Sequence, residues 1–355
     1  MIDILFFAQN GHQYDYFIKL KENLNFKIEV VRLTHLCYKS LIETDEILEY
    51  KKKEIFYKYS EFKANLYFNY VKFITPYFEC NYDYFIKKFN PKMVGLWNGV
   101  KYPQNIALKL SQNLKHLFFE NGFLPNTTQV DFKGVNALNS VPRDIEFYKK
   151  LNYTNLSLPK ELVPRKFEGN QQIVKVKLPE KFIFVPFQVA YDSQIIYFSD
   201  FKSMRELFYL IKEISEKLDL SFVFKEHPSD KKSDYSDLYK ETNDKVIFAN
   251  SISTQELIEK SEAVITINSS VGMESLLFHK KVFVLGEAFY RIDGIVKPTT
   301  KKELLNDLKD DFEIDEKLVN NFLFYLLNEY LVKDSWKNPS QEHFEEISKR
   351  LELEL

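Results

Sequence analysis

Cysteine is scarce in this sequence, since Cys37 and Cys80 are the only two among its 355 residues. They lie far apart and form no C-x-x-C pair, so neither a disulfide framework nor a zinc site of the usual spacing is indicated. Chains without such a framework are typical of reducing compartments. We therefore expect no disulfide and a cytoplasmic location.

Long apolar runs are also absent, and no stretch approaches the roughly 18 apolar residues of a membrane-spanning helix. The first apolar run, Ile4–Phe7, is short and has no basic flank, so it predicts a β-strand rather than a signal peptide. The Tyr-, Phe- and Lys-rich chain between Thr44 and Phe89 is a candidate for contact with the inner face of a membrane or with a partner enzyme. An amphipathic helix packed on a core explains the same pattern. Pro76 within this chain is expected to end a helix.

Neither sign of charge is in excess: 49 Lys and Arg face 51 Asp and Glu, for a formal net charge of -2. This balance argues against a nucleic-acid partner. No convincing DxD metal motif is present, because the pair Asp310-Asp311 lies in a charged helical region and is typical of a solvated face. We expect no metal and no cofactor.

Strand-like apolar runs that alternate with longer amphipathic segments predict α/β sheets of parallel strands. The strands expected in the first half are Ile2–Phe7, Lys27–Val31, Met93–Leu96 and His116–Phe119. Those expected in the second half are Phe182–Pro186, Ser221–Phe224, Val246–Ala249, Ala263–Thr266 and Val282–Leu285. The chain from Glu316 onward is predicted to be purely helical.

A polar stretch from Pro159 to Pro179 has no clear period and carries several prolines, so we interpret it as an interdomain linker. The chain length fits two α/β domains. We predict Rossmann-like domains over residues 1–165 and 180–310 that face each other across a cleft, and helices over residues 311–355. The final helix is a candidate to cross back to the first domain.

Polar clusters follow four predicted strands, at the sheet edge where ligands bind in such folds. They are Glu120-Asn121-Gly122, Gln188–Gln194, Lys225–Pro228 and Asn268–Glu274. Ser269 and Ser270 open a helix, so backbone N–H groups, hydroxyls and the helix dipole are available to an anion. A plain helix N-cap explains the same serines.

His227 is a second candidate ligand for a phosphate, and Pro228 would stiffen the turn that aims it. A histidine that only satisfies nearby backbone groups is the alternative. Because the His227 and Ser269 clusters lie one strand–helix unit apart, we favour a phosphate site made by both.

Several of these segments resemble those of known transferases. Lys225–Pro228 and the double serine resemble the HP and serine motifs of bacterial transferases that use CMP-activated sialic acid or Kdo. The ordered segments FENGFLPNTTQVDFKGVN, FVPFQVAYDSQI, FKEHP and TINSSVGMESL, within residues 115–290, are similar to those of capsule-synthesis β-Kdo glycosyltransferases. The resemblance implies a GT-B-like fold, with an acceptor-side first domain and a second domain that binds the nucleotide sugar.

The resemblance also implies CMP-Kdo as donor and retention by double displacement, which needs a carboxylate nucleophile and a group that handles the acceptor proton. It assigns Asp192 as nucleophile, Glu120 as acid/base and His227 to the departing phosphate. The acceptor is expected to be a glycan or glycolipid. The substrate-binding residues expected are Lys225, Ser269, Ser270, Glu274 (near ribose or base), Gln188 and Asn121. Gln188, Gln194 and Lys225 are expected to keep Asp192 ionised.

Asn121 departs from neighbouring families, which place a catalytic carboxylate at this position, and an amide can be neither nucleophile nor base. Either the role belongs to Asp192, with Asp131 in reserve, or the chain is a non-catalytic nucleotide- or glycan-binding subunit of an assembly complex. Asp192 itself is alternatively a turn or helix-cap residue. A transferase of the same fold with another CMP- or NDP-sugar donor is a further alternative.

Overall fold

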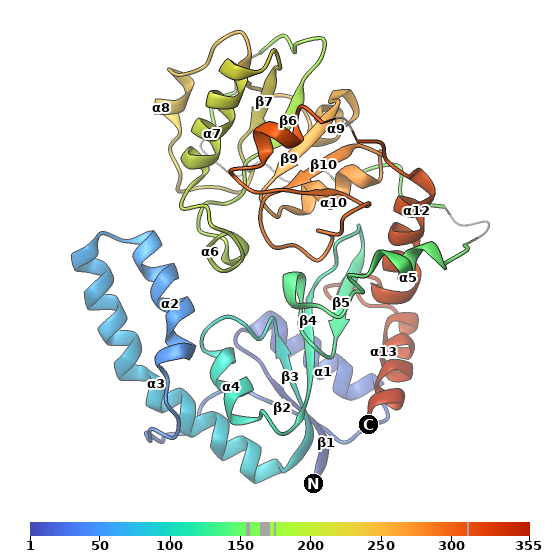
Figure 1. The fold of residues 1–355 in the computed structure, drawn as a ribbon. Coiled ribbons are helices and arrows are strands. Elements are labelled where there is room, and N and C mark those ends of the chain that lie inside the picture. The colour runs from blue at the N-terminus through green and yellow to red at the C-terminus, as the bar shows by residue number, and fades with distance from the viewer. Residues whose placement is uncertain (154–156, 164–170, 174, 311) are drawn as a thin grey trace. The chain divides into compact units, whose positions relative to one another are not determined.

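The computed structural model describes residues 1–355 except 154–156, 164–170, 174 and 311 (Figure 1). The chain forms two compact units: unit 1 is Met1–Val141 with Leu327–Leu355, and unit 2 is Pro142–Leu326. The first boundary therefore falls at Val141, before the Pro159–Pro179 stretch that we interpreted as the linker and of which residues 164–170 and 174 lie outside the described residues. It falls there because α5 (Ile145–Lys149) packs within unit 2, where the Asn321 side chain donates to the Tyr148 carbonyl over 3.0 Å.

Unit 1 is built on a mixed six-stranded sheet of order β12-β5-β4-β3-β1-β2. Its strands are β1 (Ile2–Phe7), β2 (Ile28–Val31), β3 (Pro91–Trp97), β4 (Lys115–Asn121), β5 (Thr127–Asp131) and β12 (Val332–Lys333). The four strands expected in this half are confirmed and are parallel to one another. Strand β5 was missed because its side chains Thr128, Gln129 and Asp131 are polar although they are buried.

Helices cover both faces of the unit 1 sheet. They are α1 (Gly11–Asn23), α2 (Asp45–Lys58), α3 (Glu61–Phe89), α4 (Gln104–Leu110) and α13 (Gln341–Glu354), with a short 3-10 helix at Asn136–Leu138. Helices α1 and α13 pack on one face, and α3 and α4 pack on the other. The expectation that Pro76 ends a helix is wrong, because α3 continues through it. Buried contacts along α3, Phe68 and Tyr82 among them, offset the hydrogen bond that proline removes.

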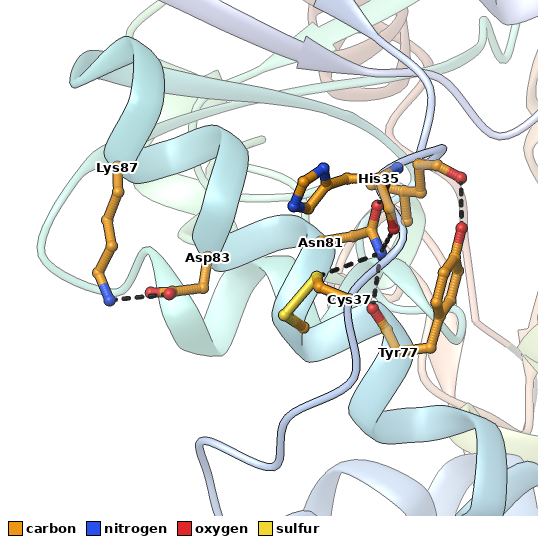
Figure 2. Close-up of a disulfide and its surroundings, with 8 residues drawn as sticks. His35, Cys37, Tyr77, Asn81, Asp83 and Lys87 are labelled. Carbon is orange, nitrogen blue, oxygen red and sulfur yellow. Dashed lines mark hydrogen bonds and ion pairs between the residues drawn. A yellow bond between two sulfur atoms is a disulfide. The ribbon is translucent and has the colours of Figure 1, made fainter.

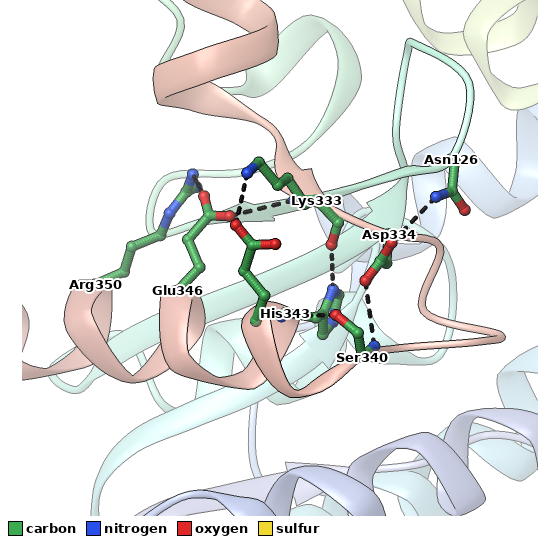
Figure 3. Close-up of polar contacts among 8 residues, drawn as sticks. Asn126, Lys333, Asp334, Ser340, His343, Glu346 and Arg350 are labelled. Atoms are coloured by element: carbon green, nitrogen blue, oxygen red, sulfur yellow. Dashed lines mark hydrogen bonds and ion pairs between the residues drawn. The ribbon is translucent and has the colours of Figure 1, made fainter.

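The last helix returns to unit 1, as we considered from the sequence. The tail is not purely helical, because Val332–Lys333 forms β12 and pairs antiparallel with β5. Figure 3 shows how α13 is then fixed: the Lys333 carbonyl lies 2.6 Å from Nδ1 of His343, and Asp334 accepts from the Asn126 side chain over 3.1 Å. His343 also lies 2.8 Å from the Tyr16 hydroxyl of α1, so the C-terminal helix is bonded into the core of the first unit.

Cys37 and Cys80 form a disulfide, which corrects our expectation of none (Figure 2). Cys80 lies on α3, and Cys37 lies on the segment that follows β2. The neighbouring Asn81 holds the same segment, because its side chain accepts from the His35 backbone N–H over 2.9 Å and donates to the His35 carbonyl over 2.8 Å. The pairing depends on tertiary packing, which the spacing of two cysteines does not reveal.

Unit 2 is built on an all-parallel sheet of order β11-β10-β9-β6-β7-β8. Its strands are β6 (Ile183–Pro186), β7 (Phe222–Lys225), β8 (Val246–Phe248), β9 (Ala263–Thr266), β10 (Lys281–Val284) and β11 (Lys297–Pro298). All five strands expected here are confirmed. In chain order the arrangement is that of the doubly wound Rossmann sheet, whose topological switch point lies between β6 and β9.

The helices of unit 2 are mostly short. Besides α5 they are α6 (Ser193–Phe198), α7 (Met204–Lys217), α8 (Ser236–Tyr239), α9 (Thr254–Lys260), α10 (Ser270–Leu276), α11 (Leu304–Asp307) and α12 (Glu316–Tyr325), which runs into a π-helical turn at Leu326–Tyr330. Side-chain caps from Ser203, Ser253 and Ser269 begin three of the helices that follow strands or their loops. Across the described residues of both units, no helix is long and apolar enough to span a bilayer.

Candidate functional site

Two buried side-chain amides link the loops at the switch point of unit 2. Gln188 follows β6 and donates to Oδ1 of Asn268, which follows β9, over 2.9 Å; the Asn268 backbone N–H donates back over 3.1 Å. Asn268 also donates to the Gln194 carbonyl over 2.8 Å. Gln188 therefore fixes the two loops to each other, and among the described contacts it does not reach Asp192 as we had expected.

Asp192 caps helix α6. Its Oδ1 accepts from the Gln194 backbone N–H over 2.9 Å, and the carboxylate is exposed to solvent. Asp192 therefore has the structural role of a helix cap, which the sequence analysis gave as the alternative. Of the three donors expected to act on Asp192, only Gln194 does so, and it does so through its backbone.

Lys225, the last residue of β7, supports the loop that follows β8. Its Nζ donates to the carbonyls of Asn250 and Ile252 over 2.8 and 2.6 Å. Burial lowers the pKa of Lys225 to about 8, against the opposing charge of Glu226. Glu226 points to the other side, where it accepts from Tyr239 and from Asn250, and burial raises the pKa of Glu226. The corrected role of Lys225 is to hold this loop rather than to contact Asp192.

A pocket of about 570 Å³ lies in unit 2 beside this loop. Lys225, Pro228 and Glu274 all line it, so two separate motifs of the sequence meet there. The other residues of the wall were not selected by the sequence analysis. They come from the loop, from α9 and from the chain before β6: Asn250, Ser251, Ile252, Ser253, Thr254, Gln255, Glu256, Glu259, Leu162 and Val163. The sequence feature that could have revealed this wall is the spacing of Ser253 and Glu256, which is typical of a helix start. Ser253 does cap the helix, because its hydroxyl accepts from the Glu256 backbone N–H over 3.1 Å. The volume suits a small-molecule ligand.

The residues expected to bind phosphate are close in sequence to residues that line this pocket. Nδ1 of His227 accepts from the Ser229 backbone N–H over 3.2 Å, which places the proton of a neutral ring on Nε2. Ser269 is buried and caps α10 by accepting from Val271 over 3.1 Å, so the N-cap alternative is correct for this serine. Ser270 is exposed and donates to Glu274 over 3.3 Å, which links it to the pocket wall.

Glu120 is the last residue but one of β4 in unit 1, and its carboxylate is held by amide groups. Nδ2 of Asn98 donates to its Oε2 over 3.0 Å, and the backbone and side chain of Asn121 donate to its Oε1 over 3.0 and 3.1 Å. Oδ1 of Asn121 in turn accepts from the Trp336 indole over 2.9 Å. Asn121 thus orients the carboxylate beside it.

Asp131, the reserve candidate for the catalytic carboxylate, has a structural role. It is buried and accepts from the backbone N–H groups of Lys133, Gly134 and Ser140 over 2.7, 3.1 and 2.7 Å. The Tyr330 hydroxyl adds a further bond of 3.0 Å. These donors fix the turn after β5.

The predicted site residues divide between the two units. Glu120 and Asn121 belong to unit 1, and the others belong to unit 2, so their assembly in one cleft stays a prediction. Among the described residues, no group of three His, Cys, Asp or Glu side chains is placed to hold a metal ion. Asp310 is exposed and Asp311 lies outside the described residues, so independence of metals also stays a prediction.

Two Rossmann-type units, one of them with the full parallel strand order, define an α/β protein of the GT-B-like class. The structure of Thermosulfurimonas dismutans KpsC, a β-Kdo 2,7 transferase, supports this fold with a TM-score of 0.53 over 99% of this chain and 100% of that chain. The sequences are 16% identical, so the likeness concerns the fold.

Residues 164–336 match the family of capsule polysaccharide biosynthesis proteins. Protein FixF of Sinorhizobium fredii is 36% identical over 252 residues, which are 70% of this chain and 62% of FixF, so the chain spans less than two thirds of that relative. The capsule polysaccharide export protein KpsS of Escherichia coli is 26% identical over 281 residues, 61% of this chain and 71% of KpsS. Together, these matches show that the chain is similar to capsule polysaccharide biosynthesis proteins.

Proposed function

We propose that the chain is a retaining glycosyltransferase that transfers β-Kdo from CMP-Kdo to a glycan or glycolipid acceptor in surface-polysaccharide biosynthesis. The observation that carries the proposal is the unit 2 pocket, where Lys225 and Pro228 of one motif meet Glu274 of the other at the carboxyl edge of a Rossmann sheet. Ligands bind at this edge in doubly wound folds.

CMP is proposed to occupy this pocket, with its phosphate near His227, Ser269 and Ser270 and with Glu274 near the ribose or base. Lys225 supplies a positive charge at the pocket wall. Because the Ser269 hydroxyl already caps α10, its share in binding is the positioning of the turn. His227 is proposed to donate through Nε2, and Ser270 is proposed to donate once its hydroxyl proton turns from Glu274 to the phosphate.

The proposed chemistry uses two carboxylates in succession. The Asp192 carboxylate attacks the anomeric carbon, the bond to the phosphate oxygen breaks, and CMP leaves with the bonding electrons, so that an ester joins Asp192 to the sugar. Glu120 then accepts the proton of the acceptor hydroxyl as that oxygen displaces Asp192 from the opposite face. Two inversions give net retention.

Nucleotide binding and product stereochemistry test the proposal. Calorimetry is expected to show binding of CMP and weaker or no binding of UDP and GDP, and transfer from CMP-Kdo is expected to give a β-linked product. His227→Ala is expected to weaken CMP binding about tenfold, or about 1.4 kcal/mol. His12→Ala, on an exposed histidine of unit 1, is the matched control and leaves CMP binding unchanged. Preference for UDP or GDP would favour the alternative donor, and an α-linked product would exclude the double displacement.

An enzyme whose acceptor lies on a membrane is expected to reach the bilayer surface, and we propose that α3 makes this contact. Phe62, Leu66, Tyr70 and Phe73 form one helical stripe with exposed fractions of 80, 66, 55 and 67%. Lys63 and Lys72 flank the stripe and favour an anionic lipid surface. Phe62→Ser with Phe73→Ser is expected to abolish cosedimentation with anionic vesicles while CMP binding is retained.

A further inference from the structure

Unit 1 contains a second pocket, of about 490 Å³, that the proposed chemistry does not use. Residues that follow β1 and β2 line it, among them Ala8, Gln9 and Arg32. Tyr82 of α3 and Tyr102, before α4, contribute aromatic walls. The pocket therefore lies at the carboxyl edge of its own sheet, where doubly wound folds bind ligands.

Arg32 gives this pocket its charge. It is the only charged side chain among the described residues that line the pocket. Its guanidinium lies over the Tyr14 ring, with 5.4 Å from Cζ to the ring centroid, and no carboxylate of the described residues forms an ion pair with it. A guanidinium stays protonated and presents a planar fork of donors that fits carboxylate or phosphate oxygens.

The N-terminus of α1 adds to the positive electrostatic potential that Arg32 creates in the pocket. Nη2 of Arg32 lies 3.7 Å from the position that a Cβ on Gly11, the first residue of α1, would take. The helix has 13 residues, and its N-terminus carries a partial positive charge. An anion bound by Arg32 would therefore be stabilised by this helix as well.

The remaining walls suit a sugar ring. Tyr102 is half-buried and its hydroxyl lies 3.2 Å from that of Thr75, which leaves the aromatic ring to form the wall. Aromatic faces pack against the C–H groups of a pyranose, while the exposed Gln9 and Thr34 side chains can bond to hydroxyls. Arg32 is itself exposed, so its guanidinium is accessible to an acidic group on such a ring.

From this geometry we infer that the unit 1 pocket binds an anionic sugar residue and that Arg32 recognises its carboxylate or phosphate. The inference rests on the proposed function, in which this unit takes the acceptor, and it specifies that the acceptor unit bound here is acidic. Arg32 acts in binding and takes no part in bond making.

Calorimetry on the whole chain with three probes tests the inference: methyl β-glucuronide carries a carboxylate, glucose 6-phosphate carries a phosphate, and methyl β-glucoside is neutral. At least one anionic probe is expected to bind tenfold or more tightly than the neutral one, and the stronger of the two identifies the anion. Arg32→Gln is expected to remove this preference, whereas Arg32→Lys keeps part of it. Arg205→Gln, on a surface arginine paired with Asp237 in unit 2, is the matched control and keeps all of it.

The outcomes separate this inference from the proposed function. Equal binding of the three probes, no binding of any of them, or an unchanged preference in Arg32→Gln overturns the inference, whatever CMP does. Loss of CMP binding alone, with the Arg32-dependent preference intact, overturns the proposed donor and not this site. The CMP affinity and melting temperature of Arg32→Gln, expected to equal those of the native chain, show that the variant is folded.

Discussion

The side-chain amide of Asn121 donates to the carboxylate of Glu120 over 3.1 Å, while its oxygen accepts from the Trp336 indole over 2.9 Å. Both ends of this amide are therefore used. An aspartate at the same place would keep the acceptor for Trp336 but would set a second negative charge against Glu120. The departure of Asn121 from neighbouring families is thus compatible with a working Glu120, and it gives no support to a non-catalytic chain.

Asn121→Asp is expected to slow the second chemical step tenfold or more, because it replaces a donor to Glu120 with a like charge. Formation of the sugar–enzyme adduct is expected to proceed at the native rate, since Glu120 is proposed to act only on the acceptor. Rapid-quench measurement of the two steps distinguishes them. Asn113→Asp, at an exposed position of the same unit, is the control. Equal slowing of both steps would indicate a general structural defect instead.

Lys225 predicts a defined pH dependence for CMP binding in the proposed donor pocket. Its pKa is lowered from 10.5 to about 8 by burial, so its charge is lost as the pH rises through about 8. CMP affinity measured by calorimetry between about pH 6.5 and 9.5 is therefore expected to fall severalfold across this midpoint. Lys225→Met is expected to bind CMP weakly and without this dependence. A native affinity that stays constant to pH 9.5 would contradict a role for the Lys225 charge.

The lowered pKa of Lys225 also affects the stability of the fold, in the opposite direction to its effect on CMP affinity. Between about pH 8 and 10.5 the unfolded chain holds a proton on Lys225 that the folded chain has released. The contribution of this residue to stability therefore rises with pH in that window, because the unfolded state binds more protons there. Denaturant unfolding of native and Lys225→Met protein across this range isolates the effect.

The Cys37–Cys80 disulfide is expected to stabilise unit 1. It closes a loop of 43 residues, for which the chain-entropy estimate is about 4 kcal/mol. Dithiothreitol is expected to lower the melting temperature of the oxidised protein by several degrees, whereas a Cys37→Ser, Cys80→Ser double variant melts at one temperature with or without it. Two free thiols in the native protein purified without reductant, with no change on reduction, would show that the bond does not form.

Sequence periodicity was sufficient for the regular parts of the fold. Apolar strands such as Phe182–Pro186 are buried on both faces, and their composition alone marks them. Strand β5 was not recognisable because its buried side chains are polar and bond to groups outside the strand, as Gln129 does by donating to the Asn121 carbonyl over 2.6 Å. The disulfide and the passage of α3 through Pro76 likewise depend on contacts between distant segments.

The candidate site, too, could be predicted from the sequence only in part. Strand ends pointed to Lys225, Pro228 and Glu274, because a Rossmann sheet collects its loops at one edge whatever their sequence. The partners of these residues were not predictable, since they depend on which loops become neighbours. Gln188 pairs with Asn268 across the switch point, and Lys225 with the carbonyl of Asn250, and neither pair is close in the chain.

The central claim is that Asp192 becomes covalently bonded to the donor sugar, and intact-protein mass spectrometry after incubation with CMP-Kdo tests it most directly. Glu120→Gln, which blocks the second step, is expected to gain the mass of one Kdo residue, with the adduct on the peptide that contains Asp192. Asp192→Asn is expected to gain no mass and to lose transfer while it binds CMP as the native chain does. A fully active Asp192→Asn variant, or an adduct on another residue, would contradict the claim.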